Sequence, residues 1–144
     1  MIYLGADHQG FELKEKTKKW LTAWNYKFED LGNQRLETED DYPDFAIKVV
    51  RKLGKEGNFG ILFCSSGVGM EIVANRFPKV RCGLGFSQQQ IRIAKRDDNL
   101  NCLALAADFT SDDDAKAMIQ IFLETQFSKG EKYLRRLKKI EKIK

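Results

Sequence analysis

A turn at residues 64–69, which begins with a cysteine, has the residue types that proton-transfer chemistry requires. It reads Cys64, Ser65, Ser66, Gly67, Val68 and Gly69, directly after an apolar run over residues 59–64. Small residues at a strand-to-helix junction let backbone N–H groups converge on an anion. The positive helix end is expected to lower the pKa of the thiol, which could then remove a proton from a carbon beside a carbonyl group. The N–H groups would stabilise the resulting oxyanion; a structural cysteine above an ordinary turn is the alternative.

A second polar segment follows the first apolar run and contains Asp7 and the single histidine of the chain, His8. Asp7 can accept hydrogen bonds from sugar hydroxyls. His8 titrates near neutrality and can bind a phosphate or exchange protons with a ring oxygen. Alternatively, Asp7 caps the first helix and His8 is a surface residue. The G-x-G-x-x-G spacing of a dinucleotide site is absent, so no nucleotide cofactor is expected.

The elements that position these residues alternate along the chain. Short apolar runs predict five strands, at residues 2–5, 26–31, 59–64, 80–85 and 101–106. Helical periodicity or start signals predict helices at residues 13–24, 45–53, 66–75, 87–96 and 112–127. This alternation predicts an α/β fold with a five-stranded parallel sheet, and ligands bind at the carboxyl ends of such strands. Both polar segments are therefore expected at one edge of the sheet.

Composition and charge exclude several classes of protein. The three cysteines are spaced far apart in apolar runs, which argues against a disulfide framework and a zinc site. One histidine and scattered acids predict no metal site. With no signal-like N-terminus and no apolar run of membrane length, we expect a soluble cytoplasmic protein without a membrane partner.

The C-terminal tail, residues 128–144, carries eight Lys or Arg against two Glu, whereas the whole chain has a net charge of +4. Residues 1–127 are therefore slightly acidic. A basic helix can bind nucleic acid, but the tail also places Leu134, Leu137, Ile140 and Ile143 at helical spacing. We interpret it as an amphipathic docking helix that belongs to the same domain as the body at residues 1–127, and expect no nucleic-acid partner.

Five motifs in order along the chain resemble type B ribose-5-phosphate isomerase and the related galactose-6-phosphate isomerase subunits. They lie at residues 5–10, 41–43, 64–69, 73–76 and 80–82. The resemblance implies a Rossmann-like three-layer sandwich and aldose–ketose isomerisation of a phosphorylated sugar through an enediol, without metal or nucleotide. It also implies a homodimer, or a tetramer built from dimers, in which each site takes residues from two subunits. The tail helix is then expected to reach a partner subunit.

Roles follow from the resemblance residue by residue. Cys64 matches the base that moves a proton between C1 and C2, and Ser66 matches the hydroxyl residue beside it. Substrate contacts are matched by Asp7, His8, Tyr42, Ser65, Gly67, Val68 and Gly69. Asn75 lies in a matching segment with a structural role. Met70 stands where some relatives use Glu, and Glu71 is one residue away, so the chain is similar to the cysteine branch.

The acidic residues Asp97, Asp98 and Asp108 depart from the family pattern. Asp97 and Asp98 replace a His-Asn pair, so the imidazole that opens the sugar ring is missing. Asp97 can still exchange protons with a sugar hydroxyl, and Asp98 can accept hydrogen bonds from one, although adjacent acids repel one another and a phosphate. After the fifth strand, Asp108 lies in the segment where the family often has a phosphate-binding Arg, so a positive contact has become a negative one.

Two cations near the C-terminus preserve part of the expected phosphate site. Lys132 and Arg136 match an Arg pair of the family if one insertion is allowed; otherwise Glu131 and Arg135 occupy those positions. Four-residue spacing places Lys132 and Arg136 on one face of a helix.

Three functions remain open. The first is an isomerase that interconverts ribose 5-phosphate and ribulose 5-phosphate. The second is an isomerase of galactose 6-phosphate or allose 6-phosphate, working alone or with a distinct partner subunit. The third is a non-catalytic sugar-phosphate-binding module, which the intact Cys64, Ser66 and turn glycines disfavour.

Overall fold

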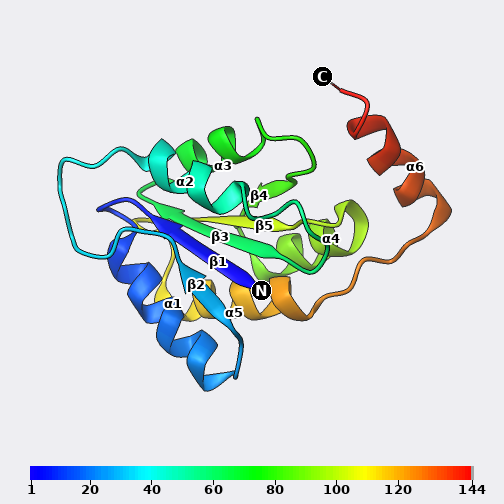
Figure 1. Cartoon of the computed structure of the whole chain (residues 1–144). Helices are drawn as coiled ribbons and strands as arrows, with labels where there is room; N and C mark the ends of the chain where they lie inside the picture. Colours follow the sequence, from blue (N-terminus) through cyan, green and yellow to red (C-terminus); the bar gives the residue numbers. More distant parts are fainter. Residues whose placement is uncertain (144) are drawn as a thin grey trace.

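The computed structural model describes residues 1–143, and its five strands form one parallel sheet (Figure 1). The strands are β1 (Ile2–Ala6), β2 (Phe28–Asp30), β3 (Phe59–Cys64), β4 (Cys82–Leu84) and β5 (Cys102–Ala106), in the order β2-β1-β3-β5-β4. The predicted α/β fold with a five-stranded parallel sheet is confirmed. The bounds of β3 match the prediction, whereas β2 and β4 are shorter than predicted. These two are the edge strands of the sheet, paired on one side, and only three of their residues pair.

Six helices accompany the sheet. They are α1 (Phe11–Ala23), α2 (Tyr42–Val50), α3 (Val68–Ala74), α4 (Gln88–Asp98), α5 (Asp112–Glu124) and α6 (Glu131–Ile140). Ser87 and Ser111 begin α4 and α5 because their hydroxyl oxygens accept hydrogen bonds from the N–H groups of Gln90 (3.2 Å) and Asp114 (3.1 Å). Lys144, the last residue of the predicted tail segment, lies outside the described residues.

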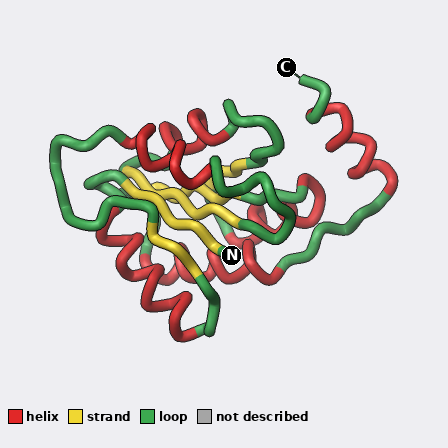
Figure 2. The backbone as a smooth tube through the Cα atoms, in the orientation of Figure 1, coloured by secondary structure: helices red, strands yellow, loops and turns green. Residues whose placement is uncertain are grey.

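The helices cover both faces of the sheet, which gives the three layers that the family resemblance implied (Figures 1 and 2). Successive side chains of a strand point to opposite faces. Ile61 and Phe63 of β3 pack in the core that contains α1, α4 and α5. Leu62 and Cys64 pack in the core beneath α2 and α3. The thiol of Cys64 therefore faces the α2–α3 layer.

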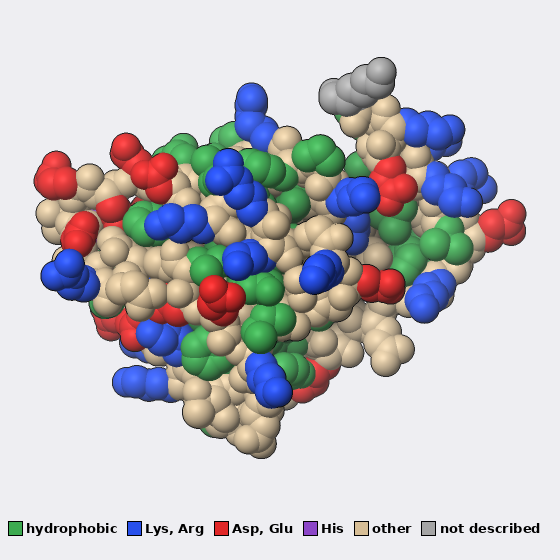
Figure 3. Space-filling view, viewed as in Figure 1, with side chains coloured by type: hydrophobic (Ala, Val, Ile, Leu, Met, Phe, Trp, Pro, Cys, Tyr) green, Lys and Arg blue, Asp and Glu red, His purple; other side chains and the backbone are tan. Residues whose placement is uncertain are grey.

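Helix α6 stands apart from the body of the molecule (Figure 1). All ten of its residues remain at least partly exposed, and Leu134 and Ile140 are among the exposed large apolar side chains. Figure 3 shows Lys and Arg side chains gathered over this end of the molecule, with acidic side chains concentrated at the opposite end of the view. The predicted amphipathic tail helix is thus present, and its apolar stripe has little contact with its own domain.

Candidate active site

The Cys64 turn joins β3 to α3 as the sequence predicted. Gly67 begins α3 with a left-handed backbone (φ 73°), and a Cβ atom there would approach Cδ1 of Leu84 to 2.5 Å. A Cβ atom on Gly69 would lie 2.7 Å from the ring of Tyr42. Glycine at both positions lets the turn pass between β4 and the start of α2. The turn and Tyr42 therefore form one packed unit.

The pKa of Cys64 contradicts the sequence-based expectation of an acidified thiol. Burial raises the pKa of Cys64 above its ordinary value, and the carboxylate of Asp7 acts in the same direction. Backbone N–H groups of Met70, Gly67 and Ser66 oppose this rise but do not overcome it. The helix end does favour the thiolate, as predicted, but the cost of placing a charge in a site that leaves Cys64 only 5% exposed is larger.

Asp7 follows β1 at the same edge of the sheet and is almost fully buried. Its Oδ1 atom accepts a hydrogen bond from the N–H of Gly10 (2.9 Å), so it does hold the start of α1, as the capping alternative proposed. Burial raises the pKa of Asp7, while the Gly10 bond and the nearby His8 lower it. Asp7 thus combines a structural bond with a position beside the Cys64 thiol.

His8 is held by a residue that the sequence analysis did not identify. Its Nδ1 atom lies 2.7 Å from Oδ1 of Asp40, and its backbone N–H donates to the same oxygen at 3.1 Å. The side chain of Asn33 donates to Oδ2 of Asp40 at 2.7 Å. Asp40 lies in a run of three acids before α2, and no periodicity in the sequence distinguishes it from Glu39 and Asp41.

The two serines of the turn have different partners. The hydroxyl of Ser65 donates to Oδ2 of Asp108 (2.6 Å), and the N–H of Asp108 donates to the carbonyl of Ser65 (3.1 Å). The hydroxyl of Ser66 accepts from the N–H of Val68 at 3.3 Å. Asp108 therefore lies against the Cys64 turn, where it adds an acidic side chain beside the candidate site.

Residues that follow the turn along the chain hold it against β4 by hydrogen bonds. Glu71 accepts a hydrogen bond from the N–H of Leu84 (3.0 Å). Asn75 bonds to both the N–H and the carbonyl of Cys82, each at 2.9 Å. Met70 is fully buried. These contacts give Glu71 and Asn75 structural roles.

The remaining predicted residues lie at the other edge of the sheet. Asp97 and Asp98 end α4, which runs back toward the amino ends of the strands, and Lys132 lies near Asp97 at the start of α6 (Figure 1). The six residues of β3 alone extend over about 17 Å. One copy of the chain therefore separates Asp97, Asp98, Lys132 and Arg136 from Cys64 by more than a pentose phosphate can span.

Asp97 is engaged in an ion pair. Arg96 donates from Nε to Oδ1 (2.6 Å) and from Nη2 to Oδ2 (3.1 Å). Arg96 holds the pKa of Asp97 below its ordinary value, and Tyr133 and Lys132 act in the same direction. A carboxylate stabilised in this way is a poor proton carrier near neutral pH.

The face of α6 that carries Lys132 and Arg136 also carries Tyr133. The Lys132 ammonium lies 4.7 Å and the Arg136 guanidinium 5.9 Å from the centre of the Tyr133 ring. Glu131 and Arg135 line a separate hollow along α6 with Leu134. The four-residue spacing therefore places Lys132 and Arg136 together, as predicted, on the side of α6 that meets the end of α4.

A cavity of about 510 Å³ lies at the amino edge of the sheet, away from Cys64. Lys79, Arg81 and Lys95 are among its lining residues. The buried ammonium of Lys95 donates to the carbonyl of Leu100 (2.5 Å), and burial lowers its pKa to about 8. We assign the chemistry to the carboxyl edge in spite of this cavity, because the buried thiol, the histidine and the N–H-rich turn meet there.

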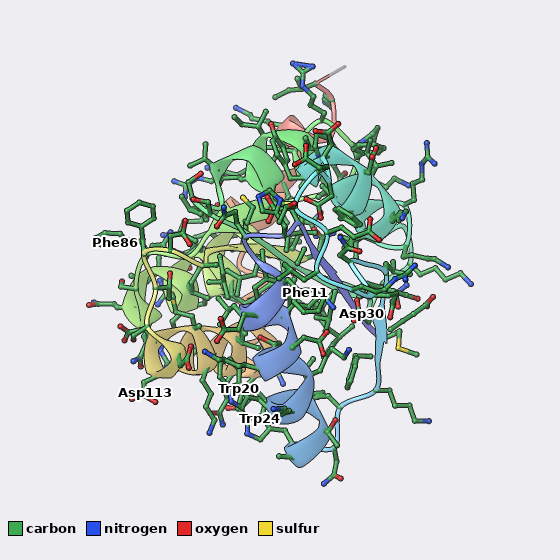
Figure 4. All side chains as sticks on the ribbon, turned by 90° about the vertical axis from the view of Figure 1, so that its left-hand side faces the viewer. Phe11, Trp20, Trp24, Asp30, Phe86 and Asp113 are labelled. Atoms are coloured by element: carbon green, nitrogen blue, oxygen red, sulfur yellow. The ribbon has the colours of Figure 1, made fainter. Side chains whose placement is uncertain are left out.

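Exposed apolar side chains surround the Cys64 turn. Phe86 follows β4 and is 86% exposed, and Phe109 follows β5 and is 80% exposed. Figure 4 looks onto this edge and shows Phe86 projecting away from the body. Ile72 on α3 is also exposed. Large apolar side chains left exposed in this way are available for contact with another protein.

Among residues 1–143, no three His, Cys, Asp or Glu side chains come together in an arrangement that could hold a metal ion. Within the same range, every helix is too short or too polar to cross a membrane.

The chain is similar to known proteins over nearly its whole length. Residues 2–140 match the family described as Ribose/Galactose Isomerase. Ribose-5-phosphate isomerase B of Mycobacterium tuberculosis is 34% identical over 137 residues, covering 94% of this chain and 85% of that protein. A ribose 5-phosphate isomerase structure from Thermotoga maritima is 38% identical, with a TM-score of 0.92 and coverage of 99% and 97%. The Mycoplasma genitalium isomerase B structure with bound ribulose 5-phosphate is 33% identical, with a TM-score of 0.93 and coverage of 97% and 93%.

Proposed function

The chain belongs to the ribose/galactose isomerase family, and from this premise we propose that it interconverts ribose 5-phosphate and ribulose 5-phosphate in the cytoplasm. One observation carries the proposal most directly. The sulfur of Cys64 lies at the end of a central strand, with the N–H groups of Met70, Gly67 and Ser66 around it. The similar structure that holds ribulose 5-phosphate supports the choice of sugar.

The proposed reaction needs one base and one set of hydrogen-bond donors. The thiolate of Cys64 takes the proton from C2 of the open-chain aldose, and the electron pair forms the enediolate while charge develops on O1. N–H groups of the turn stabilise that oxygen. The thiol then returns the proton to C1, and the proton on O2 moves to O1, which restores a hydroxyl at C1 and leaves the carbonyl of the ketose at C2. Asp7 and Tyr42 are placed to hold sugar hydroxyls.

We further propose that two copies of the chain build each site. In a two-fold dimer, α6 of one subunit would bring Lys132 and Arg136 to the carboxyl ends of the strands of the other subunit, here called the Cys64 edge. There they would bind the phosphate. The separation of the two residue groups within one copy supports this arrangement. The apolar stripe of α6 and the exposed Phe86 and Phe109 supply surfaces that a second copy would cover. Tetramers would form by association of such dimers.

Isomerisation of a hexose 6-phosphate is the second candidate function. The matching family includes galactose isomerases, and Asp97, Asp98 and Asp108 replace residues typical of the ribose branch. Assays of the purified chain with ribose 5-phosphate, allose 6-phosphate and galactose 6-phosphate separate the two. We expect ribose 5-phosphate to have the highest kcat/KM, by at least about tenfold, because one extra carbon unit in a fitted pocket costs about that factor. Preference for a hexose phosphate would reassign the substrate, and binding without turnover would indicate a binding module.

Asp97 provides a second test because it stands where the family has the histidine that opens the sugar ring. Since Arg96 keeps this carboxylate ionised, we expect slow opening of the ribose 5-phosphate ring. Ribulose 5-phosphate has no furanose form, so its conversion avoids that step. Asp97→His should therefore raise kcat/KM in the aldose direction by up to about 10²-fold and change the ketose direction little.

A matched control places the same imidazole at the amino edge but away from α6. Glu124→His substitutes an exposed acid at the end of α5 and should leave both directions unchanged. If Asp97→His changes neither direction, or lowers both equally, then Asp97 is not the residue that limits ring opening.

A further inference from the structure

Both carboxylate oxygens of Asp40 accept hydrogen bonds beside the Cys64 turn. Its side chain is only 7% exposed. One oxygen accepts from both the ring Nδ1 and the backbone N–H of His8, and the other accepts from the side chain of Asn33. His8 thus makes two hydrogen bonds to a residue 32 positions away in the sequence.

We infer that Asp40, held in place by Asn33, is a positioning residue that orients His8 to bind the phosphate of the sugar substrate. The inference rests on the proposed function for the identity of the ligand. The geometry fixes the roles of the two ring nitrogens, because the proton on Nδ1 is used in the bond to Asp40. Nε2 is then the remaining nitrogen, and it donates to a substrate oxygen when the ring is in its protonated form.

The surroundings of His8 favour its charged form. The hydrogen bond to Asp40 raises the pKa of His8, burial opposes the rise, and Asp7 and Glu39 act with Asp40. Burial alone would raise the pKa of Asp40, but its bonds from His8 and Asn33 lower it below its ordinary value. The two residues therefore form an imidazolium–carboxylate pair over a wider pH range than separate groups would.

The charge balance of this edge explains why a cation is needed here. Asp7, Asp40 and Asp108 all lie near the turn and repel a dianionic substrate. Lys14 and Lys18 are engaged with Asp30 and Glu15. His8 is the basic member of the cluster, and an imidazolium N–H forms a charge-assisted bond to a phosphate oxygen. Because Asp40 raises the pKa of His8, the ring is more often protonated and less able to remove a proton from a sugar hydroxyl.

The single histidine of the chain makes a direct test practicable, because its ring protons give an unambiguous signal in proton NMR. The titration of His8 is compared in the wild type, Asp40→Asn and Glu39→Gln. Glu39→Gln is the matched control, since it removes a neighbouring exposed charge that makes no bond to His8. We expect the pKa of His8 to fall in Asp40→Asn and to remain close to the wild-type value in Glu39→Gln. Inorganic phosphate should shift the His8 signal at pH 8 in the wild type and less in Asp40→Asn.

Kinetics separate a positioning role from a structural one. Asp40→Asn should raise KM for ribulose 5-phosphate roughly tenfold or more at pH 8, since a bond to a charged group is lost, with a smaller change in kcat. The difference in KM between the two proteins should narrow as the pH is lowered toward about 6, because a larger fraction of His8 is then protonated in Asp40→Asn. In a His8→Asn background, Asp40→Asn should have little further effect.

Several results would overturn the inference. The first is an unchanged pKa of His8 in Asp40→Asn. The second is an equally large kinetic effect of Asp40→Asn in the His8→Asn background. The third is a loss of activity in Asp40→Asn that is confined to the aldose direction, which would place His8 at the ring oxygen. Absence of isomerase activity in the wild type would defeat the proposed function instead. The NMR comparison and the phosphate titration would still decide whether Asp40 positions His8.

Discussion

Cys64→Ala is expected to lower kcat for isomerisation by at least about 10²-fold while the fold and much of the affinity for ribulose 5-phosphate remain. The thiol supplies proton transfer, whereas the hydrogen bonds that bind the sugar come from the turn, Asp7 and Tyr42. Steady-state kinetics and calorimetric binding to the same variant measure the two effects separately. A drop of less than tenfold in kcat would remove Cys64 from the role of base.

The other two cysteines provide matched controls. Cys82 and Cys102 are buried thiols on the paired strands β4 and β5, directly opposite each other in register. Replacing either by alanine should lower the free energy of unfolding by about 1 kcal/mol and leave kcat unchanged. Denaturant unfolding and the isomerase assay together test this contrast. An inactive Cys82 or Cys102 variant that is still folded would show that sensitivity to cysteine loss is not specific to the turn.

The raised pKa of Cys64 fixes the sign of the pH dependence. A base acts only when deprotonated, and burial together with Asp7 keeps Cys64 largely as a thiol at neutral pH. Activity should therefore rise with pH as the thiolate fraction grows. This rising part of the pH–activity profile should be absent from the residual activity of Cys64→Ala. Cations brought by α6 of a neighbouring subunit would move the rise toward lower pH.

The turn after β3 was predictable because its signals are local. A buried apolar run, a cysteine and two glycines lie within a dozen residues, and each restricts the backbone in a known way. The alternation of strands and helices predicted the sheet for the same reason. Edge strands β2 and β4 were predicted too long, because apolar residues continue beyond the three that pair.

The contacts of His8 and the pKa of Cys64 could not be obtained in this way. Asp40 reaches His8 across 32 residues from an irregular loop, and hydrogen bonds of that kind leave no period in the sequence. The pKa of the thiol depends on the balance between helix N–H groups and burial, and burial at a strand end follows from tertiary packing. The helix terminus contributes only one side of that balance, and burial contributes the other.

Within one subunit, Cys64 lies at the carboxyl ends of the strands and the Lys132/Arg136 pair lies at their amino ends. If two subunits share each site, mixed dimers of inactive variants should recover activity. Variants Cys64→Ala and Lys132→Ala/Arg136→Ala should each be inactive as pure dimers. Co-expressed with different affinity tags and purified through both, they give mixed dimers. In such a dimer, one site combines an intact Cys64 edge from one subunit with intact cations from the other. We expect about half of the wild-type activity per dimer, because one of two symmetric sites is complete.

The control for this experiment pairs two variants from the same edge. Mixed dimers of Cys64→Ala and His8→Asn contain no complete site, since each Cys64 edge carries one defect, and they should show no gain over the pure variants. If the Cys64 and Lys132/Arg136 variants form mixed dimers but recover nothing, while the purified wild type is active, the cations act within their own subunit or not at all. An active wild-type monomer in sedimentation would contradict the shared site equally, because α6 would then have to turn back across its own domain to reach Cys64.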